Sequence, residues 1–312
     1  MSTDCGIRFQ RKFGIVIRFI FYTYQLGHVY FFFETMIPAL FALYSVPLAL
    51  IWALVGVYLI YCTWSYYALC FIKGPGFLSD LLEKNEVLAA PERILKRAPR
   101  NSSQTIRELF DQTNKPLHLL TDPGYCKECK AIKPLRTHHC RVCNKCVLHM
   151  DHHCMWIGTC IGWNNLRFFL KLNVIGAIGS FYSSATLTLC SPHGLYKYYP
   201  WLFDTVGYID LAIGKLITAL AGCNLYLAAH GMTYLEFLSI FSKRSTEEET
   251  TRRYYGYIDW RDNFYKIFGS FGVFSSLFLS GMNQELELNG TEWAHLVQGD
   301  PGLFAINPRK RN

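Results

Sequence analysis

Long apolar runs separated by polar segments dominate the pattern along this chain of 312 residues. A helix needs about 20 mostly apolar residues to cross a hydrocarbon core of about 30 Å. Runs of that length occur at residues 14–33, 46–71, 168–190 and 206–229. The pattern therefore predicts a multi-pass α-helical membrane protein with four transmembrane helices.

Few charged residues interrupt these runs. Arg18 lies near the start of the first run, where its long side chain can reach the membrane interface. The same run contains His28, which we expect to be neutral there. The fourth run contains Asp210 and Lys215, five positions apart. These two side chains need not face lipid, and they can pair or line a cavity.

Composition agrees with a membrane protein, because 51% of the residues are hydrophobic and the mean hydropathy is +0.13. No early stretch combines a short apolar core with a small-residue cleavage site, so we expect the first run to be an anchor and not a removable signal peptide.

The distribution of basic residues predicts the orientation in the membrane. Fourteen Lys and Arg lie between residues 73 and 165, whereas the connections 34–45 and 191–205 contain none and one. The positive-inside rule therefore places both termini and the long central loop in the cytosol. The net charge of +8 follows from this loop and the tails, and needs no nucleic-acid partner to explain it.

The central loop ends in a dense group of seven Cys and five His between residues 126 and 160. Sliding this segment against itself reveals a repeat of fourteen residues. In each copy a C-x2-C pair is followed by a His ten residues later and a Cys seven further on. Three Cys and one His form a known ligand set for structural zinc.

The repeat predicts two closed zinc sites, each with four ligands. The first would use Cys126, Cys129, His139 and Cys146, and the second Cys140, Cys143, His153 and Cys160. Neighbouring residues such as His139 and Cys140 can serve different metals because side chains alternate along an extended segment. Disulfides or unrelated buried thiols are the alternatives, but a cytosolic loop is reducing and the spacing is regular.

Cys154 is the thiol that this assignment leaves over. It would open a third copy of the repeat, but Ile157 stands where the second Cys of the pair would be. A free Cys needs a base or a cationic neighbour to act as a nucleophile. His152 can be that base and Asp151 can orient its ring, as in a catalytic triad.

Closeness in sequence does not by itself bring these three side chains into hydrogen-bonding reach. However, His153 and Cys160 would attach the backbone on either side of Cys154 to zinc. On this interpretation zinc shapes a loop and the thiolate does the chemistry. The alternative is that Cys154 is an inert buried thiol.

The position of Cys154 suggests a substrate, because the cysteine-rich segment would lie directly beneath the bilayer. Each buried methylene contributes about 0.8 kcal/mol, so a sixteen-carbon acyl chain can contribute on the order of 10 kcal/mol to binding a thioester there. A coenzyme A head group would need nearby cations. Those available are Lys133, Arg136, Arg141 and Lys145.

At this point a family resemblance becomes clear. The segment CKECKAIKPLRTHHCRVCNKCVLHMDHHCMWIGTC resembles the cysteine-rich domain of the DHHC-type protein S-acyltransferases, or palmitoyltransferases. The match extends over residues 126–168, and four spans with this domain between the second and third fit the family's architecture. The resemblance implies two structural Zn²⁺ and acyl-CoA, such as palmitoyl-CoA, as donor substrate.

The resemblance also implies roles for individual residues. Cys154 would carry the acyl group as a thioester, making the protein itself a lipoprotein, and would pass it to a cysteine of a substrate protein. His152 would activate the thiol and Asp151 would hold His152. Lys133 and Arg136 match basic positions near the coenzyme A head.

Outside the cysteine-rich segment the resemblance is looser. The family's T-T-x-E signature appears as TYLE, which keeps Thr233 and Glu236 but has Tyr234 at the threonine that normally supports the catalytic aspartate. Asn263 lies in WRDNFYKIFG, which resembles the family's aromatic C-terminal motif.

Further departures are a GPG at 74–76 where the family has Asp-Pro-Gly, Met155 where proline is usual, and GTC in place of an Asn-Asn-Cys ending. An Asp-Pro-Gly does occur, but later, at 122–124.

The expected organisation comprises six segments. They are a cytosolic N-terminus (1–13), the first two transmembrane helices (14–72), a cytosolic linker (73–125), the zinc-binding catalytic domain (126–167), the last two helices (168–230) and a cytosolic C-terminal region (231–312). The apolar stretch at 265–280 is too short to span, so it would pack at the membrane face, cap the catalytic domain or form a small cytosolic core.

Two other classes of function compete with the acyltransferase. A membrane-tethered zinc finger that recognises nucleic acid or protein would not require Cys154, and no basic recognition helix for nucleic acid is present. A catalytically weak family member that acts as a zinc-binding adaptor draws support from the altered positions Tyr234 and Met155. The resemblance implies a Golgi or endoplasmic reticulum membrane, cysteine-containing substrate proteins and, in some cases, an accessory subunit.

Overall fold

The computed structural model describes residues 2–82, 124–133, 136–190, 198–242 and 259–268. Most of the expected linker and most of the C-terminal region, including residues 269–280 of the apolar stretch, lie outside these described residues.

The expected fold class is confirmed by four helical stretches that are long and apolar enough to cross a membrane. Among the described residues these are Lys12–Leu43, Val46–Lys73 (α3), Leu166–Cys190 (α8) and Pro200–Ala229 (α9). The cysteine-rich region lies between the second and the third. Proline near the start of α3 and of α9 suits the first turn of a helix, where its missing N–H has no intrahelical partner.

The first span is longer than the sequence predicted. It consists of α1 (Ser2–Phe31), a π-helical turn (η1, Phe32–Met36) and α2 (Ile37–Leu43), so most of the expected connection 34–45 is helical. Pro38 lies at the start of α2. A proline ring crowds the preceding helical turn, and a wider turn ahead of it relieves that clash.

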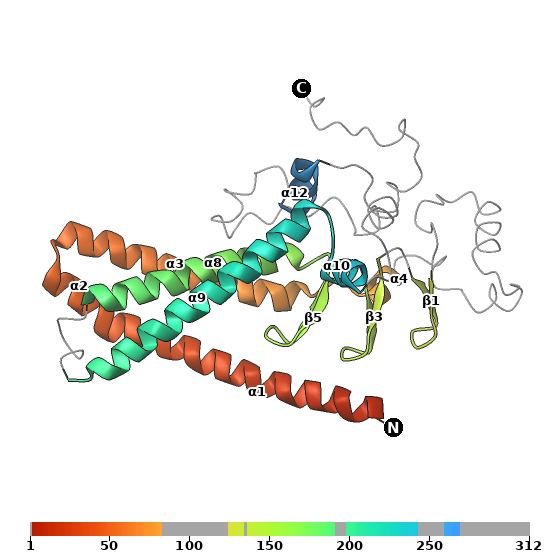
Figure 1. Cartoon of the computed structure of the whole chain (residues 1–312), viewed down its shortest axis with the longest axis horizontal. Coiled ribbons are helices and arrows are strands. Elements are labelled where there is room, and N and C mark those ends of the chain that lie inside the picture. Colours follow the sequence, from red (N-terminus) through yellow and green to blue (C-terminus); the bar gives the residue numbers. More distant parts are fainter. Residues whose placement is uncertain (1, 83–123, 134–135, 191–197, 243–258, 269–312) are drawn as a thin grey trace, which may run out of the picture.

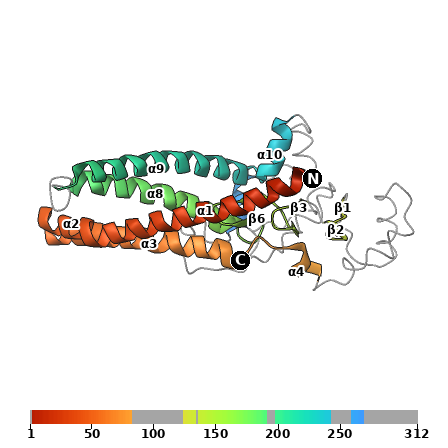
Figure 2. The same cartoon turned by 90° about the horizontal axis from the view of Figure 1, so that it is seen from below.

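The spans form an elongated bundle (Figure 1). In the view of Figure 2, α8 and α9 lie along one side and α1 and α3 along the other. Helix α8 packs against both α3 and α9. The indole nitrogen of Trp52 in α3 donates to Thr186 Oγ1 in α8 at 2.9 Å, and Tyr182 Oη donates back to the carbonyl oxygen of Trp52 at 2.7 Å.

A polar cluster joins three of the spans within the bundle. Asp210 of α9 is 2% exposed and accepts hydrogen bonds from the hydroxyls of Tyr24 in α1 and Ser183 in α8. His28 Nε2 in α1 lies 2.9 Å from the same carboxylate. Asp210 is therefore shielded by partners on other helices and not by Lys215, which is exposed, so the sequence expectation holds for Asp210 and is wrong for Lys215.

Replacing Asp210 by Leu should lower the free energy of unfolding by about 3 kcal/mol, because it leaves His28, Tyr24 and Ser183 without their shared acceptor. Asp210→Asn keeps an acceptor oxygen and should cost less. Thermal unfolding of the detergent-solubilised protein measures both. Equal midpoints for Asp210→Leu and the wild type would contradict the prediction.

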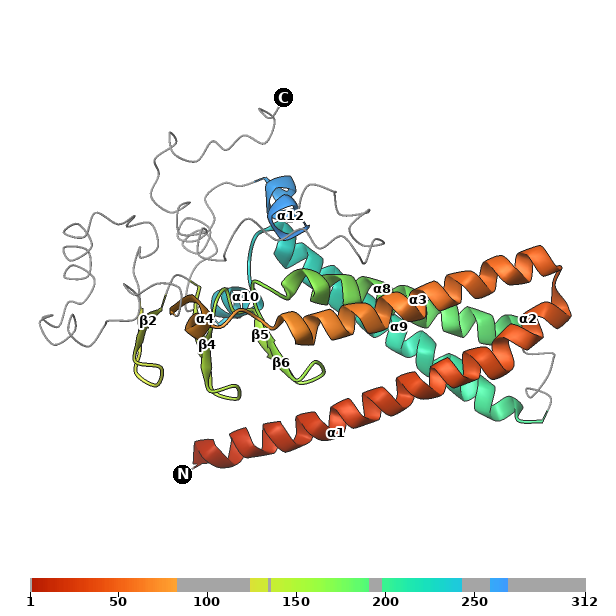
Figure 3. The same cartoon turned by 180° about the vertical axis from the view of Figure 1, so that it is seen from behind.

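The cysteine-rich region folds as three antiparallel hairpins in a row at one end of the bundle (Figures 1 and 3). They pair β1 (Gly124–Cys126) with β2 (Ala131–Lys133), β3 (His138–Cys140) with β4 (Lys145–Val147), and β5 (His152–Cys154) with β6 (Thr159–Ile161). Successive hairpins start fourteen residues apart in the chain and have the same register. The repeat found in the sequence is therefore a structural repeat with three copies.

The turns of the hairpins also repeat. Equivalent positions Lys130, Asn144 and Gly158 have positive φ angles of 50°, 55° and 85°. This left-handed conformation favours glycine, which occurs in the third copy. An added Cβ at Gly158 would also lie 2.0 Å from Arg18 Nη1, so α1 packs directly against the third hairpin turn.

Three short helices lie at the same end of the molecule as the hairpins (Figure 1). They are α4 (Leu78–Leu82), α10 (Tyr234–Phe241) and α12 (Trp260–Phe268). Asn263 Nδ2 in α12 donates to the carbonyl oxygen of Ala229 at 2.8 Å, which attaches α12 to the last turn of α9.

Candidate active site and metal sites

Two groups of metal-ligand side chains assemble as the sequence predicted. In each group the donor atoms lie within 4.8 Å of one another. The first contains Cys126, Cys129, His139 and Cys146, and the second contains Cys140, Cys143, His153 and Cys160.

The separations within the groups fit tetrahedral zinc. Zn–S and Zn–N bonds of about 2.3 and 2.0 Å imply ligand-to-ligand edges of about 3.5–3.8 Å. His139 Nδ1 lies 3.5, 3.3 and 3.9 Å from the sulfurs of its three cysteines. His153 Nδ1 lies 3.6, 3.4 and 3.5 Å from those of the second group. With four protein donors each, both groups are suited to a structural ion.

Strand geometry explains how neighbouring residues serve different purposes. Side chains at i and i+2 of a strand share a face, so His152 and Cys154 lie on one side of β5 and His153 on the other. His153 pairs across the hairpin with Cys160, another ligand of its group. A metal at this group would therefore attach both strands of the hairpin that presents Cys154.

The third hairpin packs against the spans. Cys154 is 5% exposed. Ile157, which stands where the other two copies of the repeat have their second cysteine, is 3% exposed. Both belong to an apolar cluster with residues of α3 and α8 such as Tyr66 and Leu170. Tyr67 Oη of α3 donates to the carbonyl oxygen of Trp156 in the hairpin turn at 3.0 Å. The thiol is thus held at the junction of the hairpins and the bundle.

Two residues of the expected triad are in direct contact, and Cys154 lies on the same face of β5 as His152. His152 Nδ1 lies 2.7 Å from Asp151 Oδ2. Burial acts to lower the pKa of His152, but the hydrogen bond with Asp151 and the nearby Asp151 and Cys154 groups raise that pKa to about 9. The imidazole is therefore suited to hold a proton beside the Cys154 sulfur.

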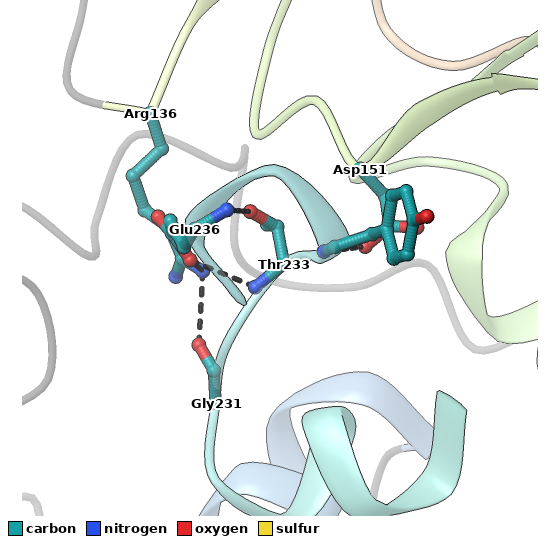
Figure 4. A network of polar contacts seen from close by, with 6 residues as sticks. Arg136, Asp151, Gly231, Thr233 and Glu236 are labelled. Atoms are coloured by element: carbon teal, nitrogen blue, oxygen red, sulfur yellow. Dashed lines mark hydrogen bonds and ion pairs between the residues drawn. The ribbon is translucent and has the colours of Figure 1, made fainter. Parts of the chain in front are cut away.

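Asp151 has a second partner, which the sequence did not reveal. Its Oδ1 atom accepts a hydrogen bond of 2.7 Å from the backbone N–H of Tyr234, the first residue of α10 (Figure 4). Tyr234 thus supports the aspartate through its main chain, although it lacks the threonine hydroxyl of the T-T-x-E signature. No side-chain pattern announces a backbone donor, so only the fold could reveal this contact.

Thr233 and Glu236 form the N-terminal cap of α10. Glu236 N donates to Thr233 Oγ1, and Thr233 N donates to Glu236 Oε2, which is a reciprocal capping box. Glu236 also binds Arg136 (Figure 4). These expected motif residues are therefore adjacent to Asp151.

The two expected coenzyme A contacts differ in environment. Lys133 is half-buried and ends β2, in the hairpin that lies farthest from the spans in the row (Figure 3). The Arg136 side chain is 1% exposed and pairs with Glu236 at 2.7 Å. The Arg136 guanidinium is thus engaged with a carboxylate inside the protein.

Asn165 has a structural role that spacing alone could not predict. It is fully buried, and its Oδ1 accepts from Gly162 N at 2.9 Å. Its Nδ2 donates to the carbonyl oxygens of Cys70 in α3 at 2.9 Å and Cys160 in β6 at 3.0 Å. One side chain therefore fastens the end of α3, the third hairpin and the start of α8.

The backbone conformation explains the first glycine of the GPG segment. Gly74, which follows α3, has φ 63° and ψ 175°, a region that other residues essentially do not adopt. Gly76 accepts from Leu148 N at 2.9 Å, so this turn packs directly on the hairpins. An aspartate at position 74 would require a different backbone conformation.

Comparison with known proteins agrees with this site. Residues 120–253 match the family model described as DHHC palmitoyltransferase. Over 132 residues the chain is 36% identical to "Probable protein S-acyltransferase 15" of Arabidopsis thaliana, covering 41% of this chain and 51% of that relative.

Two further relatives align over shorter segments. "Palmitoyltransferase ZDHHC2" of Rattus norvegicus is 38% identical over 102 residues, which are 31% of this chain and 27% of that protein. "Probable protein S-acyltransferase 12" of Arabidopsis thaliana is 60% identical over 47 residues, 15% of this chain and 16% of the relative. The matched segments thus span about half of these curated relatives, or less.

The family model, these relatives, the two metal-ligand groups and the four spans agree with one another. Over residues 120–253 the chain is therefore similar to the DHHC palmitoyltransferases, and together these findings support the DHHC family.

Proposed function

We propose that this protein is a protein S-acyltransferase that moves a long-chain fatty acyl group from acyl-CoA to its own Cys154 and then to cysteine thiols of substrate proteins. The observation that carries the proposal is the position of Cys154. It is buried where the third hairpin meets the spans, beside the His152–Asp151 pair, and belongs to neither metal-ligand group.

In the first half-reaction the Cys154 sulfur attacks the thioester carbonyl carbon of acyl-CoA. His152 accepts the thiol proton, and Asp151 orients the imidazole and balances its positive charge. A new carbon–sulfur bond forms to Cys154, the bond to the coenzyme A sulfur breaks, and the proton passes from His152 to that departing sulfur. Coenzyme A leaves, and the enzyme retains the acyl group.

In the second half-reaction a cysteine thiol of the substrate protein attacks the acyl carbon on Cys154. His152 takes the incoming proton and returns it to the Cys154 sulfur as the enzyme's thioester breaks. This is a ping-pong sequence, and it regenerates the starting enzyme. The apolar cluster around Cys154 favours a donor with a long hydrocarbon chain.

Two zinc ions would supply structural cross-links and not a reacting centre. Each ligand group offers four protein donors, which leaves no open coordination position. His153 and Cys160 would bind the same ion from opposite strands of the hairpin and so fix the loop of Cys154. Lys133 remains a candidate contact for the coenzyme A head.

The distribution of basic residues supports an orientation in which the hairpins and both termini face the cytosol. We further propose a Golgi or endoplasmic reticulum membrane and cysteine-containing proteins as partners, as the family resemblance implies. The adaptor alternative rested on Tyr234 and Met155. The hydrogen bond from Tyr234 N to Asp151 favours the enzyme, because Asp151 keeps a partner without the threonine.

The proposal is tested by incubating purified wild-type protein in detergent with a sixteen-carbon acyl-CoA that carries a clickable tail. We expect label on the protein that hydroxylamine releases, as it does from a thioester. Adding a cysteine peptide should then move the label to the peptide. A protein that contains zinc but takes up no label would support the adaptor instead.

A further inference from the structure

The carboxylate of Asp151 is held at both ends. One oxygen lies 2.7 Å from His152 Nδ1, and the other accepts from Tyr234 N at 2.7 Å. The hairpins supply Asp151 and His152, whereas Tyr234 begins a helix 83 residues further along the chain. The direction of the imidazole therefore depends on where α10 begins relative to β5.

Arg136 connects the segment that carries Asp151 with the start of α10. Its side chain binds Glu236 twice, with Nε to Oε1 at 2.8 Å and Nη2 to Oε2 at 2.7 Å. Its Nη2 also donates to the carbonyl oxygen of Gly231 at 2.9 Å, in the segment that leads into α10 (Figure 4). A two-point contact of this kind fixes orientation as well as distance.

The main chain of Arg136 bonds to the segment that carries Asp151. Its carbonyl oxygen accepts from the N–H of Met150, the residue before Asp151, at 3.1 Å. Arg136 thus bonds through its carbonyl oxygen to the backbone beside Asp151, and through its side chain to the N-terminal cap of α10. The first N–H of α10 in turn binds Asp151. Arg136 and Glu236 have side chains that are 1% and 8% exposed, so solvent weakens this pair little.

We propose that Arg136 and Glu236 are positioning residues that set the start of α10, so that the backbone N–H of Tyr234 holds Asp151 and, through it, His152. The proposal rests on the acyltransferase function proposed above. It assigns Arg136 a role distinct from contact with coenzyme A, and it explains how this chain works with a tyrosine where its family has a threonine. A main-chain donor is present whatever the side chain.

The backbone donor can be removed by one substitution. Tyr234 is the first residue of α10, where proline fits because that N–H has no intrahelical acceptor. The preceding Thr233 has φ −89° and ψ 161°, which suits a residue before proline. In Tyr234→Pro the donor is lost and the ring occupies its place beside Asp151. Tyr234→Ala removes the same tyrosine ring but keeps the donor, so it is the matched comparison.

The first experiment measures the autoacylation rate at saturating palmitoyl-CoA for both variants, with zinc content and thermal midpoint as checks on folding. We expect Tyr234→Pro to be about 10- to 100-fold slower than Tyr234→Ala, the range for loss of one hydrogen bond to a charged group. Equal rates for the two variants would overturn the proposal.

The same two substitutions in an Asp151→Ala background separate an effect on the position of Asp151 from general damage to the fold. When Asp151 is already Ala, the Pro variant should be no more than about twofold slower than the Ala variant, because the donor then has nothing to hold. An undiminished ratio in this background would show that proline acts on the fold and would overturn the proposal. If the wild type itself takes up no label, the acyltransferase function fails, which is a different result.

Autoacylation rates at saturating palmitoyl-CoA also test the Arg136–Glu236 pair. Variants of this pair keep the proposal testable if Tyr234→Pro fails to fold. Arg136→Met and Glu236→Gln should each slow autoacylation at saturating donor about tenfold, and the double variant should lose less than the product of the two. The KM for palmitoyl-CoA should stay within about twofold in all three. A raised KM with an unchanged maximal rate for Arg136→Met would indicate a head-group contact and contradict the positioning role.

Discussion

Cys154→Ser should abolish uptake of thioester-linked acyl label from acyl-CoA. A serine hydroxyl is a far poorer nucleophile than a thiolate near neutral pH, and any ester it formed would resist the hydroxylamine treatment that releases a thioester. We therefore expect labelling to fall at least 1,000-fold, an order-of-magnitude figure based on losses of catalytic nucleophiles in other acyl-transfer enzymes. In-gel fluorescence before and after hydroxylamine measures it.

The chain offers a matched control for this experiment. Cys223 in α9 is exposed and belongs to neither ligand group, so Cys223→Ser should keep wild-type labelling. Both variants should contain as much zinc as the wild type. Label that persists on Cys154→Ser, or that disappears with Cys223→Ser, would contradict the assignment of Cys154 as the nucleophile.

Much of the site could be predicted because metal ligation and repetition leave a dense pattern in the sequence. The fourteen-residue repeat identified both ligand groups, and the third hairpin has the same register as the other two. In that third copy Ile157 stands where the second cysteine of a ligand pair would be, and Cys154 and Ile157 pack on the spans, while His153 and Cys160 of the same hairpin belong to the second ligand group. Cys154 therefore lies outside both ligand groups and can serve as a nucleophile.

The contacts that connect distant segments could not be predicted in the same way. Tyr234 acts through a backbone N–H, so its side chain carries no signal of the role. The sequence shows the charge of Arg136 but neither its burial nor its contact with Glu236. The length of the first span was also missed, since a π-helical turn continues the helix past Glu34 and Pro38.

The second large effect should come from loss of the metal group beside Cys154. His153 and its counterpart in the repeat, His139, are equivalent ligands of the two groups, so His153→Ala and His139→Ala form a matched pair. Each should lower the zinc content from about two ions per chain to about one, because three donors do not close a structural site. Elemental analysis of the purified proteins measures the change.

The rates of the two variants should differ even though the metal loss is the same. His153 lies next to Cys154 in β5 and pairs with Cys160 in β6, so His153→Ala frees the hairpin that presents the nucleophile. We expect autoacylation to fall at least about 100-fold there, and less in His139→Ala, whose hairpin does not carry Cys154. His153→Cys restores a fourth zinc ligand and should recover the zinc content. Equal rates for the two alanine variants would mean that the second metal does not hold the hairpin of Cys154 in place.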